Sequence, residues 1–392
     1  MTEGSLRLAF VVPRFGDEVV GGAELFGRWF ADRVAGGGHD VEVLTTCARD
    51  HRTWSNEYPA GTEQHGRLTV RRFPTDKRHL ARFAELERAI ISGDSLPREA
   101  EIEWLRNGVS STAMEEFLSS DGARYDLVLA MPYLQGVTFF AFERMRERFV
   151  LVPCLHDEPY AHTGVVAEML AGSKGLMFHT EPEAEVARRL VGDLAPSAVV
   201  GLGFDKPAAA DADAVQRRYG LDDPYLLYVG RREGGKSTPL LFDYFMRYKA
   251  RRPGNLRLVL VGSGDDPPPT HEIRTVDIDW RDRDAVMAGA TAFCHPSTNE
   301  SLSVVLLQSW LAGAPAMVNG FCEVTKYHCE RSSGGLWFLN YAEFEAIVDR
   351  LVEAPRLREG LGSNGRSYVE REYGWPAVLD RFDKAMHLWM GG

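Results

Sequence analysis

The sequence alternates short apolar runs with segments of helical spacing, and this pattern occurs twice along its 392 residues. Apolar runs separated by helices predict strands that pair in parallel, because each connection must cross back over the sheet. We therefore predict an α/β protein with two doubly wound, Rossmann-like sheets. The predicted strands are 8–12, 41–44, 68–73, 127–131, 149–153 and 175–179 in the first half, and 225–229, 256–261, 276–278, 292–294 and 316–318 in the second.

The two halves are separated by a break in the pattern near residue 205. Residues 206–211, Lys-Pro-Ala-Ala-Ala-Asp, indicate a linker. A chain of this length exceeds what one hydrophobic core usually organises. We predict domains over 1–204 and 205–375, followed by a final helix over 376–392. Ligands of such sheets bind beyond the carboxyl ends of the strands, which predicts a site in the cleft between two facing domains.

Composition excludes several classes of protein. Hydrophobic residues make up 44% and charged residues 26%, and no apolar run approaches the length of a membrane span. Five scattered cysteines argue against a disulfide framework and for a reducing cytoplasm. The net charge of −11 argues against a nucleic-acid partner. Cys322, His328 and Cys329 are close in sequence, but zinc ligands usually come as two close pairs, so we expect incidental thiols and no metal.

A basic segment interrupts this acidic chain between residues 67 and 88. Its charges are Arg67, Arg71, Arg72, Lys77, Arg78, Arg82 and Arg88. A solvated surface explains such a segment. The alternative is a patch for an anionic acceptor, or for weak contact with an anionic lipid surface.

The segment from His295 to Pro315 predicts a strand, a polar turn and a helix over 302–312. The turn residues Ser301-Leu302-Ser303 leave backbone N–H groups free for an anion or a sugar hydroxyl. Glu300 lies just before the helix, where it either caps the helix or points into a cleft. Gln308 follows eight residues later, slightly over two turns, so both side chains can contact one elongated ligand.

A second loop, 230–237, follows the predicted strand 225–229 and carries Arg231, Arg232 and Lys236. Cations in such a loop stabilise the charge that develops on a diphosphate leaving group. The spacing of Gly230 and Gly235-Lys236-Ser237 also matches a phosphate-binding P-loop. We keep the P-loop as the alternative, because no Walker B strand is evident and Glu300 would have no role in it.

The segment that holds Pro296-Ser297, Glu300 and Gly313-Ala314-Pro315 closely resembles the signature of glycosyltransferase family 4. The resemblance implies a GT-B fold and a retaining transfer from a nucleotide sugar. It also implies that Glu300 contacts the donor sugar. The family's second glutamate, which holds the ribose, is Gln308 here, and an amide oxygen can still accept from a ribose hydroxyl without the charge.

The same resemblance implies further roles. Arg231 and Lys236 would hold the diphosphate, with Gly21 and Gly22 facing it from the first domain. His156 and Asp157 would lie near the reacting carbon, and the final helix would cross back to the first domain. The residues implied near the sugar are Ser301, Leu302 and Ser303, and those near the nucleotide are Gly262, Gly264 and Ile278.

These observations lead to one functional hypothesis and two rivals. We predict a cytoplasmic, retaining glycosyltransferase that moves a hexose-type sugar from a UDP- or GDP-linked donor to a sugar, lipid-linked or small-molecule acceptor. No metal or other cofactor is expected, because Asp277-Ile278-Asp279 lies beside a strand and not in a catalytic loop. The rivals are a sugar-nucleotide epimerase or phosphorylase-like enzyme on the same fold, and a non-catalytic protein that binds nucleotide sugars, which Gln308 favours.

Overall fold

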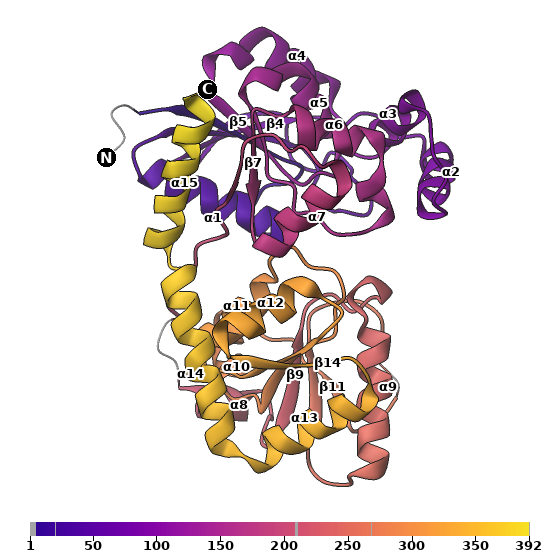
Figure 1. Cartoon of the computed structure of the whole chain (residues 1–392), viewed down its shortest axis with the longest axis vertical. Helices are drawn as coiled ribbons and strands as arrows, with labels where there is room; N and C mark the ends of the chain where they lie inside the picture. The colour runs from indigo at the N-terminus through magenta and orange to yellow at the C-terminus, as the bar shows by residue number, and fades with distance from the viewer. Residues whose placement is uncertain (1–4, 20, 208–210, 268, 392) are drawn as a thin grey trace. The chain divides into compact units, whose positions relative to one another are not determined.

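The computed structural model describes residues 5–19, 21–207, 211–267 and 269–391 (Figure 1). The chain forms two compact units. The first contains residues 1–203 together with 378–392, and the second contains residues 204–377. Of the predicted linker, residues 208–210 lie outside the described residues, whereas Lys206 lies 3.4 Å from a carboxylate oxygen of Glu370.

The first unit is built on an eight-stranded sheet in the order β3-β4-β2-β1-β5-β6-β7-β8. Every pairing is parallel except β3 with β4, which is antiparallel. The sequence did not predict β3 or β8. The β3 segment, Gly-Thr-Glu-Gln-His, is polar and largely exposed, so it carries no apolar run. The strands are β1 (Arg7–Val12), β2 (Asp40–Thr46), β3 (Gly61–His65), β4 (Leu68–Phe73), β5 (Leu127–Ala130), β6 (Phe149–Leu151), β7 (Gly175–Phe178) and β8 (Ser197–Val199).

Helices cover both faces of this sheet, which explains why the central strands are apolar throughout: in β1, residues 8–12 are fully buried. The helices are α1 (Gly22–Gly36), α2 (Leu80–Ile91), α3 (Arg98–Asn107), α4 (Thr112–Asp121), α5 (Gly136–Met145), α6 (Gly164–Gly172) and α7 (Glu181–Val191), with 3-10 turns η1 (Gly122–Arg124), η2 (Arg146–Arg148) and η3 (Pro159–His162).

The second unit has a six-stranded sheet in the order β11-β10-β9-β12-β13-β14, with all pairings parallel. Its strands are β9 (Tyr225–Val229), β10 (Arg257–Val261), β11 (Ile273–Thr275), β12 (Ala292–His295), β13 (Ala316–Asn319) and β14 (Gly335–Phe338). Its helices are α8 (Ala212–Arg218), η4 (Gly234–Lys236), α9 (Thr238–Arg251), η5 (Trp280–Asp282), α10 (Arg283–Ala288), α11 (Val304–Ala312), α12 (Glu323–Ser332), α13 (Tyr341–Glu353) and α14 (Pro355–Glu372).

The predicted strand at 276–278 was wrong. The edge strand is β11, three residues earlier, and it pairs Ile273 with Leu258. Two of its three residues, Arg274 and Thr275, are exposed at the sheet edge, so the strand lacks the apolar run that the prediction used. The ladder ends at Val276, whose N–H donates to the Leu260 carbonyl at 2.9 Å.

The last helix, α15 (Trp375–Met390), packs its carboxyl-terminal part on the first unit, where it lies beside α1 (Figure 1). Phe382 meets Phe30 of α1 edge to face, with ring centroids 4.9 Å apart. The Trp389 indole N–H donates to the Pro196 carbonyl at 3.1 Å. Its ring lies so close to Gly175 that an added Cβ there would be 2.3 Å away.

Most of the basic segment 67–88 is paired. Arg71 contacts Glu42 at 2.8 Å, Arg82 contacts Glu103 at 2.8 Å, and Arg72 is buried against Glu63. These pairs offset much of its charge, and the predicted contact with an anionic surface stays a prediction. In the described part of the chain, none of the helices combines the length and the apolar character that a membrane span needs.

Glu101 of α3 links the helical segment α2–α3, which follows β4, to α6. It is buried, and its two carboxylate oxygens accept from the N–H groups of Gly164 and Val165, at 3.0 and 2.9 Å, at the start of α6. Trp104, also on α3, stacks on Tyr160 with ring centroids 5.6 Å apart. A carboxylate from another helix therefore caps α6 and fastens this helical segment near the loop after β6.

We predict that Glu101→Ala lowers the free energy of unfolding by about 1–2 kcal/mol, because two N–H groups of α6 lose their acceptor. Urea denaturation followed by circular dichroism measures the change. Glu99→Ala, which truncates an exposed glutamate on the same helix, is the control. Equal effects of the two substitutions would contradict the capping role.

Candidate functional site

Two loops meet at the carboxyl edge of the second sheet. β9 leads into loop 230–237 and its neighbour β12 leads into loop 296–303, so parallel pairing places the loops side by side. Lys236 Nζ, from the first loop, lies 2.7 Å from Glu300 Oε1, from the second. The structure thus brings together the two charged side chains that the sequence predicted for the diphosphate and the sugar.

Glu300 is held from a second side by His295, the last residue of β12. The His295 Nε2 atom lies 3.2 Å from the same Oε1. The side chain of Glu300 is 12% exposed, and that of His295 is 3% exposed. Burial by itself raises the pKa of this carboxyl, but the Lys236 ammonium and the His295 ring outweigh it and hold the pKa of Glu300 well below its usual range. Glu300 is therefore ionised at neutral pH.

Lys236 sits on a short, fixed turn. It ends η4, and Ser237 after it has a left-handed φ of 53° before α9 begins. The Thr238 hydroxyl donates to the Glu233 carbonyl at 3.2 Å and closes the turn. Arg231, in the same loop, has a side chain that is 55% exposed and lies 3.3 Å from Glu233. Arg231 and Lys236 are therefore the cations of this loop that reach solvent.

Arg232 has a different role from its neighbour. It is 5% exposed, and its guanidinium donates to the carbonyls of Gly262, Gly264 (3.2 Å) and Asp265 (2.8 Å). The backbone of Arg232 also bonds the Ser263 carbonyl and the Asp265 N–H, both at 2.8 Å. Arg232 thus fastens the loop after β10 to the loop after β9.

Gly262 and Gly264 are needed for this close approach of two backbones. Their φ angles are +119° and +127°, which L-residues with side chains rarely adopt. An added Cβ would lie 2.3 Å from the Gly230 carbonyl oxygen at Gly262, and 2.1 Å from the Arg232 carbonyl oxygen at Gly264. Both glycines shape the loop next to the Lys236 turn, and their predicted contact with a nucleotide stays a prediction.

The turn before α11 is held from beneath by His328. His328 is fully buried, and its ring nitrogens lie 3.1 Å from the Leu302 carbonyl and 3.0 Å from the Tyr368 hydroxyl. Burial lowers the pKa of His328 to about 4, so the ring is neutral. Ser303, the residue before α11, has a φ of 63°, and its buried hydroxyl makes no hydrogen bond to any described residue.

Both ring nitrogens of His328 therefore have hydrogen-bond partners. Burial raises the pKa of its two neighbouring thiols, Cys322 and Cys329. Among the described residues, no three histidine, cysteine or acidic side chains are grouped so that they could hold a metal ion.

The two residues of this unit that were predicted near the ribose and the nucleotide, Gln308 and Ile278, are buried or partly buried. Gln308 lies in the second turn of α11 and is 6% exposed. Ile278 follows β11 and packs partly buried against the core that contains Val261 and Val276.

In the first unit, the glycine pair lies at the start of α1, but a carboxylate already covers Gly21. Gly21 is the residue before the helix, and an added Cβ there would lie 2.1 Å from Glu24 Oε2. Glu24 is paired with the buried Arg14. An anion at this helix start would have to compete with Glu24, whereas the space around Gly22 is open.

His156 and Asp157 follow β6 but have different partners. His156 is partly exposed, with Nδ1 3.5 Å from Glu158 Oε1. Asp157 contacts His162 at 3.0 Å and Arg189 at 3.1 Å, and these two partners hold its pKa below the usual range. Asp157 is thus engaged in surface ion pairs, and its predicted place near a reacting carbon is untested.

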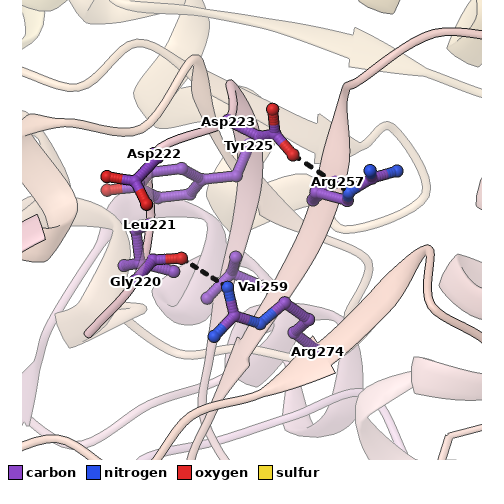
Figure 2. A pocket seen from close by; sticks show the side chains of 8 residues that line it. All are labelled: Gly220, Leu221, Asp222, Asp223, Tyr225, Arg257, Val259 and Arg274. Atoms are coloured by element: carbon purple, nitrogen blue, oxygen red, sulfur yellow. Dashed lines mark hydrogen bonds and ion pairs between the residues drawn. The ribbon is translucent and has the colours of Figure 1, made fainter. Parts of the chain in front are cut away.

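A pocket of about 140 Å³ lies at the opposite edge of the second sheet, beside Tyr225 at the start of β9 (Figure 2). Figure 2 shows that its arginines are already bound: Arg257 pairs with Asp223, and Arg274 donates to the Gly220 carbonyl. The pocket is therefore separate from the Lys236–Glu300 site.

We predict that Gly264→Ala lowers the free energy of unfolding by about 1–3 kcal/mol or more, because the new Cβ meets backbone in a disfavoured conformation. Gly254→Ala is the matched control, since nothing lies within 4 Å of a Cβ added there. Thermal unfolding of both variants measures the difference. A Gly264→Ala protein as stable as the control would contradict the close approach.

Comparison with known proteins shows that this site lies in a segment of the chain that matches a family model. Residues 223–354, which include both loops, match the model of the family described as glycosyl transferases group 1. The chain is 22% identical over 398 aligned positions to an uncharacterised glycosyltransferase of Methanocaldococcus jannaschii, covering 95% of this chain and 96% of that protein. It is 24% identical over 193 residues to glycosyltransferase 1 domain-containing protein 1 of Xenopus tropicalis, covering 46% of this chain and only 54% of that protein.

Solved structures decide the fold. Sucrose-phosphate synthase from Thermosynechococcus elongatus superposes with a TM-score of 0.74 at 17% identity, covering 99% of this chain and all of the other. The fold is GT-B. The Anabaena protein HepE, in complex with UDP and glucose, has the same architecture, with a TM-score of 0.70, 14% identity, and coverage of 97% of this chain and 99% of its own. The predicted pair of Rossmann-like sheets is confirmed, and the family-model match and the aligned relatives support a glycosyltransferase.

Proposed function

We propose that this protein is a retaining glycosyltransferase that uses a nucleoside diphosphate sugar as donor. The observation that carries the proposal is the Lys236–Glu300 pair, which lies at the carboxyl edge of the second sheet. Both residues fall within the segment that matches the glycosyl transferases group 1 model. The complex of the similarly folded HepE protein with UDP and glucose supports UDP-glucose as the first donor to test.

The cations would hold the diphosphate. The Lys236 ammonium has three N–H donors, so it can contact a phosphate oxygen while it keeps its contact with Glu300. Arg231 adds a partly exposed guanidinium from the same loop. Their charges would stabilise the negative charge that the diphosphate gains when the glycosidic bond breaks.

Glu300 and Gln308 would orient the rest of the donor. Oε1 of Glu300 is occupied by Lys236 and His295, whereas Oε2 makes no hydrogen bond to any described residue and can accept from sugar hydroxyls. Ser301, Leu302 and Ser303 would add backbone and hydroxyl contacts. Gln308 would accept from a ribose hydroxyl with its neutral oxygen.

We propose that the acceptor attacks on the side from which the diphosphate leaves, which retains the configuration. In the described structure no second carboxylate contacts Glu300 or Lys236, so we do not propose the paired carboxylates of retaining glycosidases. We assign His156 and Asp157 to the surroundings of the reacting carbon on the resemblance alone.

We predict that sugar nucleotides with one particular base raise the melting temperature by roughly 5–10 °C at a concentration 100-fold above Kd, and that those with other bases do not. A thermal-shift panel of UDP-, GDP-, ADP- and dTDP-glucose with the free nucleotides measures this, and the selected donor then enters assays of transfer and of slow hydrolysis. Binding without transfer or hydrolysis would favour a non-catalytic nucleotide-sugar-binding protein. An epimerised sugar nucleotide as the product would favour the epimerase.

With the selected donor, we predict that Glu300→Gln lowers kcat about 100-fold or more, because it removes the charge aimed at the sugar. Affinity for the free nucleotide should change little. Glu330→Gln, an exposed site on α12 of the same unit, is the control. Wild-type kcat in Glu300→Gln would exclude Glu300 from the reaction.

We predict that activity persists in excess EDTA, because Lys236 and Arg231 supply the positive charge that a metal would otherwise bring to the diphosphate. Initial rates with and without EDTA, and after addition of magnesium, measure this. Complete loss of activity that magnesium restores would contradict a metal-free mechanism.

A further inference from the structure

The contacts of Glu300 are unequally divided between its two oxygens. Oε1 lies 2.7 Å from Lys236 Nζ and 3.2 Å from His295 Nε2, whereas Oε2 makes no hydrogen bond to any described residue. One oxygen is therefore anchored twice and the other is left for a ligand. The two anchors differ in kind, because the side chain of Lys236 is 26% exposed and that of His295 is 3% exposed.

The position of His295 is unusual for a histidine. It ends a strand whose other residues are buried and largely apolar, and Phe293 lies two residues before it with ring centroids 5.7 Å apart. Both of its ring nitrogens are buried and neither makes a hydrogen bond to any described residue, although Nε2 lies 3.2 Å from Glu300 Oε1. A buried nitrogen without a partner costs free energy, so the packing of the strand does not explain the imidazole. Its contact with Glu300 does.

We propose that His295 is the positioning residue for Glu300: its Nε2 atom, 3.2 Å from Oε1, holds the carboxylate so that Oε2 stays directed at the donor sugar while Lys236 binds the diphosphate. This inference rests on the proposed function. His295 contacts no substrate in this arrangement and acts only through the Glu300 carboxylate.

The different roles of Lys236 and His295 follow from the flexibility of their side chains. Lysine has a flexible four-carbon stem, so Lys236 can shift toward a bound phosphate. The imidazole of His295 is rigid and fixed at a strand end. When Lys236 shifts, a carboxylate buried as deeply as Glu300 needs another partner, because an unpaired buried charge is strongly destabilising. His295 is the group that provides it.

The test compares two affinities in one protein. Isothermal calorimetry with UDP-glucose and with UDP, or with the corresponding pair if the panel selects another base, separates the contribution of the sugar from that of the nucleotide. The variants are His295→Phe, which keeps a ring but removes the donor, and His295→Gln, whose amide nitrogen can take the place of Nε2. His271→Phe, at an exposed histidine of the same unit, is the control.

We expect His295→Phe to weaken binding of the sugar nucleotide about tenfold or more and to lower kcat, with affinity for the free nucleotide within about twofold of wild type. His295→Gln should recover most of both losses. Equal weakening for the sugar nucleotide and the nucleotide would indicate a general structural role and overturn the proposal. So would wild-type values in His295→Phe.

If His295→Phe does not fold, His295→Gln and His295→Asn decide the matter, because only the longer amide reaches the position of Nε2. Gln active and Asn impaired supports the proposal, and equal behaviour overturns it. A wild-type protein that binds no sugar nucleotide would overturn the proposed function, and this inference with it. That outcome is distinct from a failure of His295 alone.

Discussion

A buried, ionised carboxylate organises the second unit. Glu300 can remain charged at 12% exposure only because Lys236 and His295 contact it. Lys236 comes from the loop after β9 and His295 from the end of the adjacent strand β12, so the contact depends on parallel pairing of the sheet. The carboxylate in turn ties the two loops together. The ion pair is therefore as much a constraint on loop structure as a feature of the chemistry.

That constraint extends outward through backbone contacts. Arg232 joins the loop after β9 to the loop after β10, and Gly264 permits the approach because it has no side chain. On the other side, His328 holds the turn at Leu302. The loops after β10, β9 and β12 are thus linked in turn, the first two by Arg232 and the last two by the Lys236–Glu300 pair. A site built in this way is preorganised before a ligand binds.

The sequence predicted the fold well where apolar runs are long and buried. β4 and β9 have the predicted bounds, whereas β3 and β11 were missed or misplaced because edge strands carry polar residues. The resemblance to the family signature also indicated Lys236 and Glu300, and it selected Arg231 and not Arg232 for the diphosphate. Spacing alone does not distinguish the two arginines, since which of them turns inward depends on carbonyls some 30 residues away. His295 was within the motif, but its role depends on a distance that no spacing reveals.

Gln308 stands where the family signature has a second glutamate, and the effect of this difference can be assessed by counting charges. The side chains that we assign to the donor in the second unit carry two positive charges, Arg231 and Lys236, and one negative charge, Glu300. A glutamate in place of Gln308 would cancel the remaining positive charge at a buried position. If Gln308 holds the ribose, as we propose, its neutral amide would bond the ribose more weakly than a carboxylate and would leave a net positive field for the diphosphate. In this chain we infer that binding depends more on the diphosphate and less on the ribose than the family pattern implies.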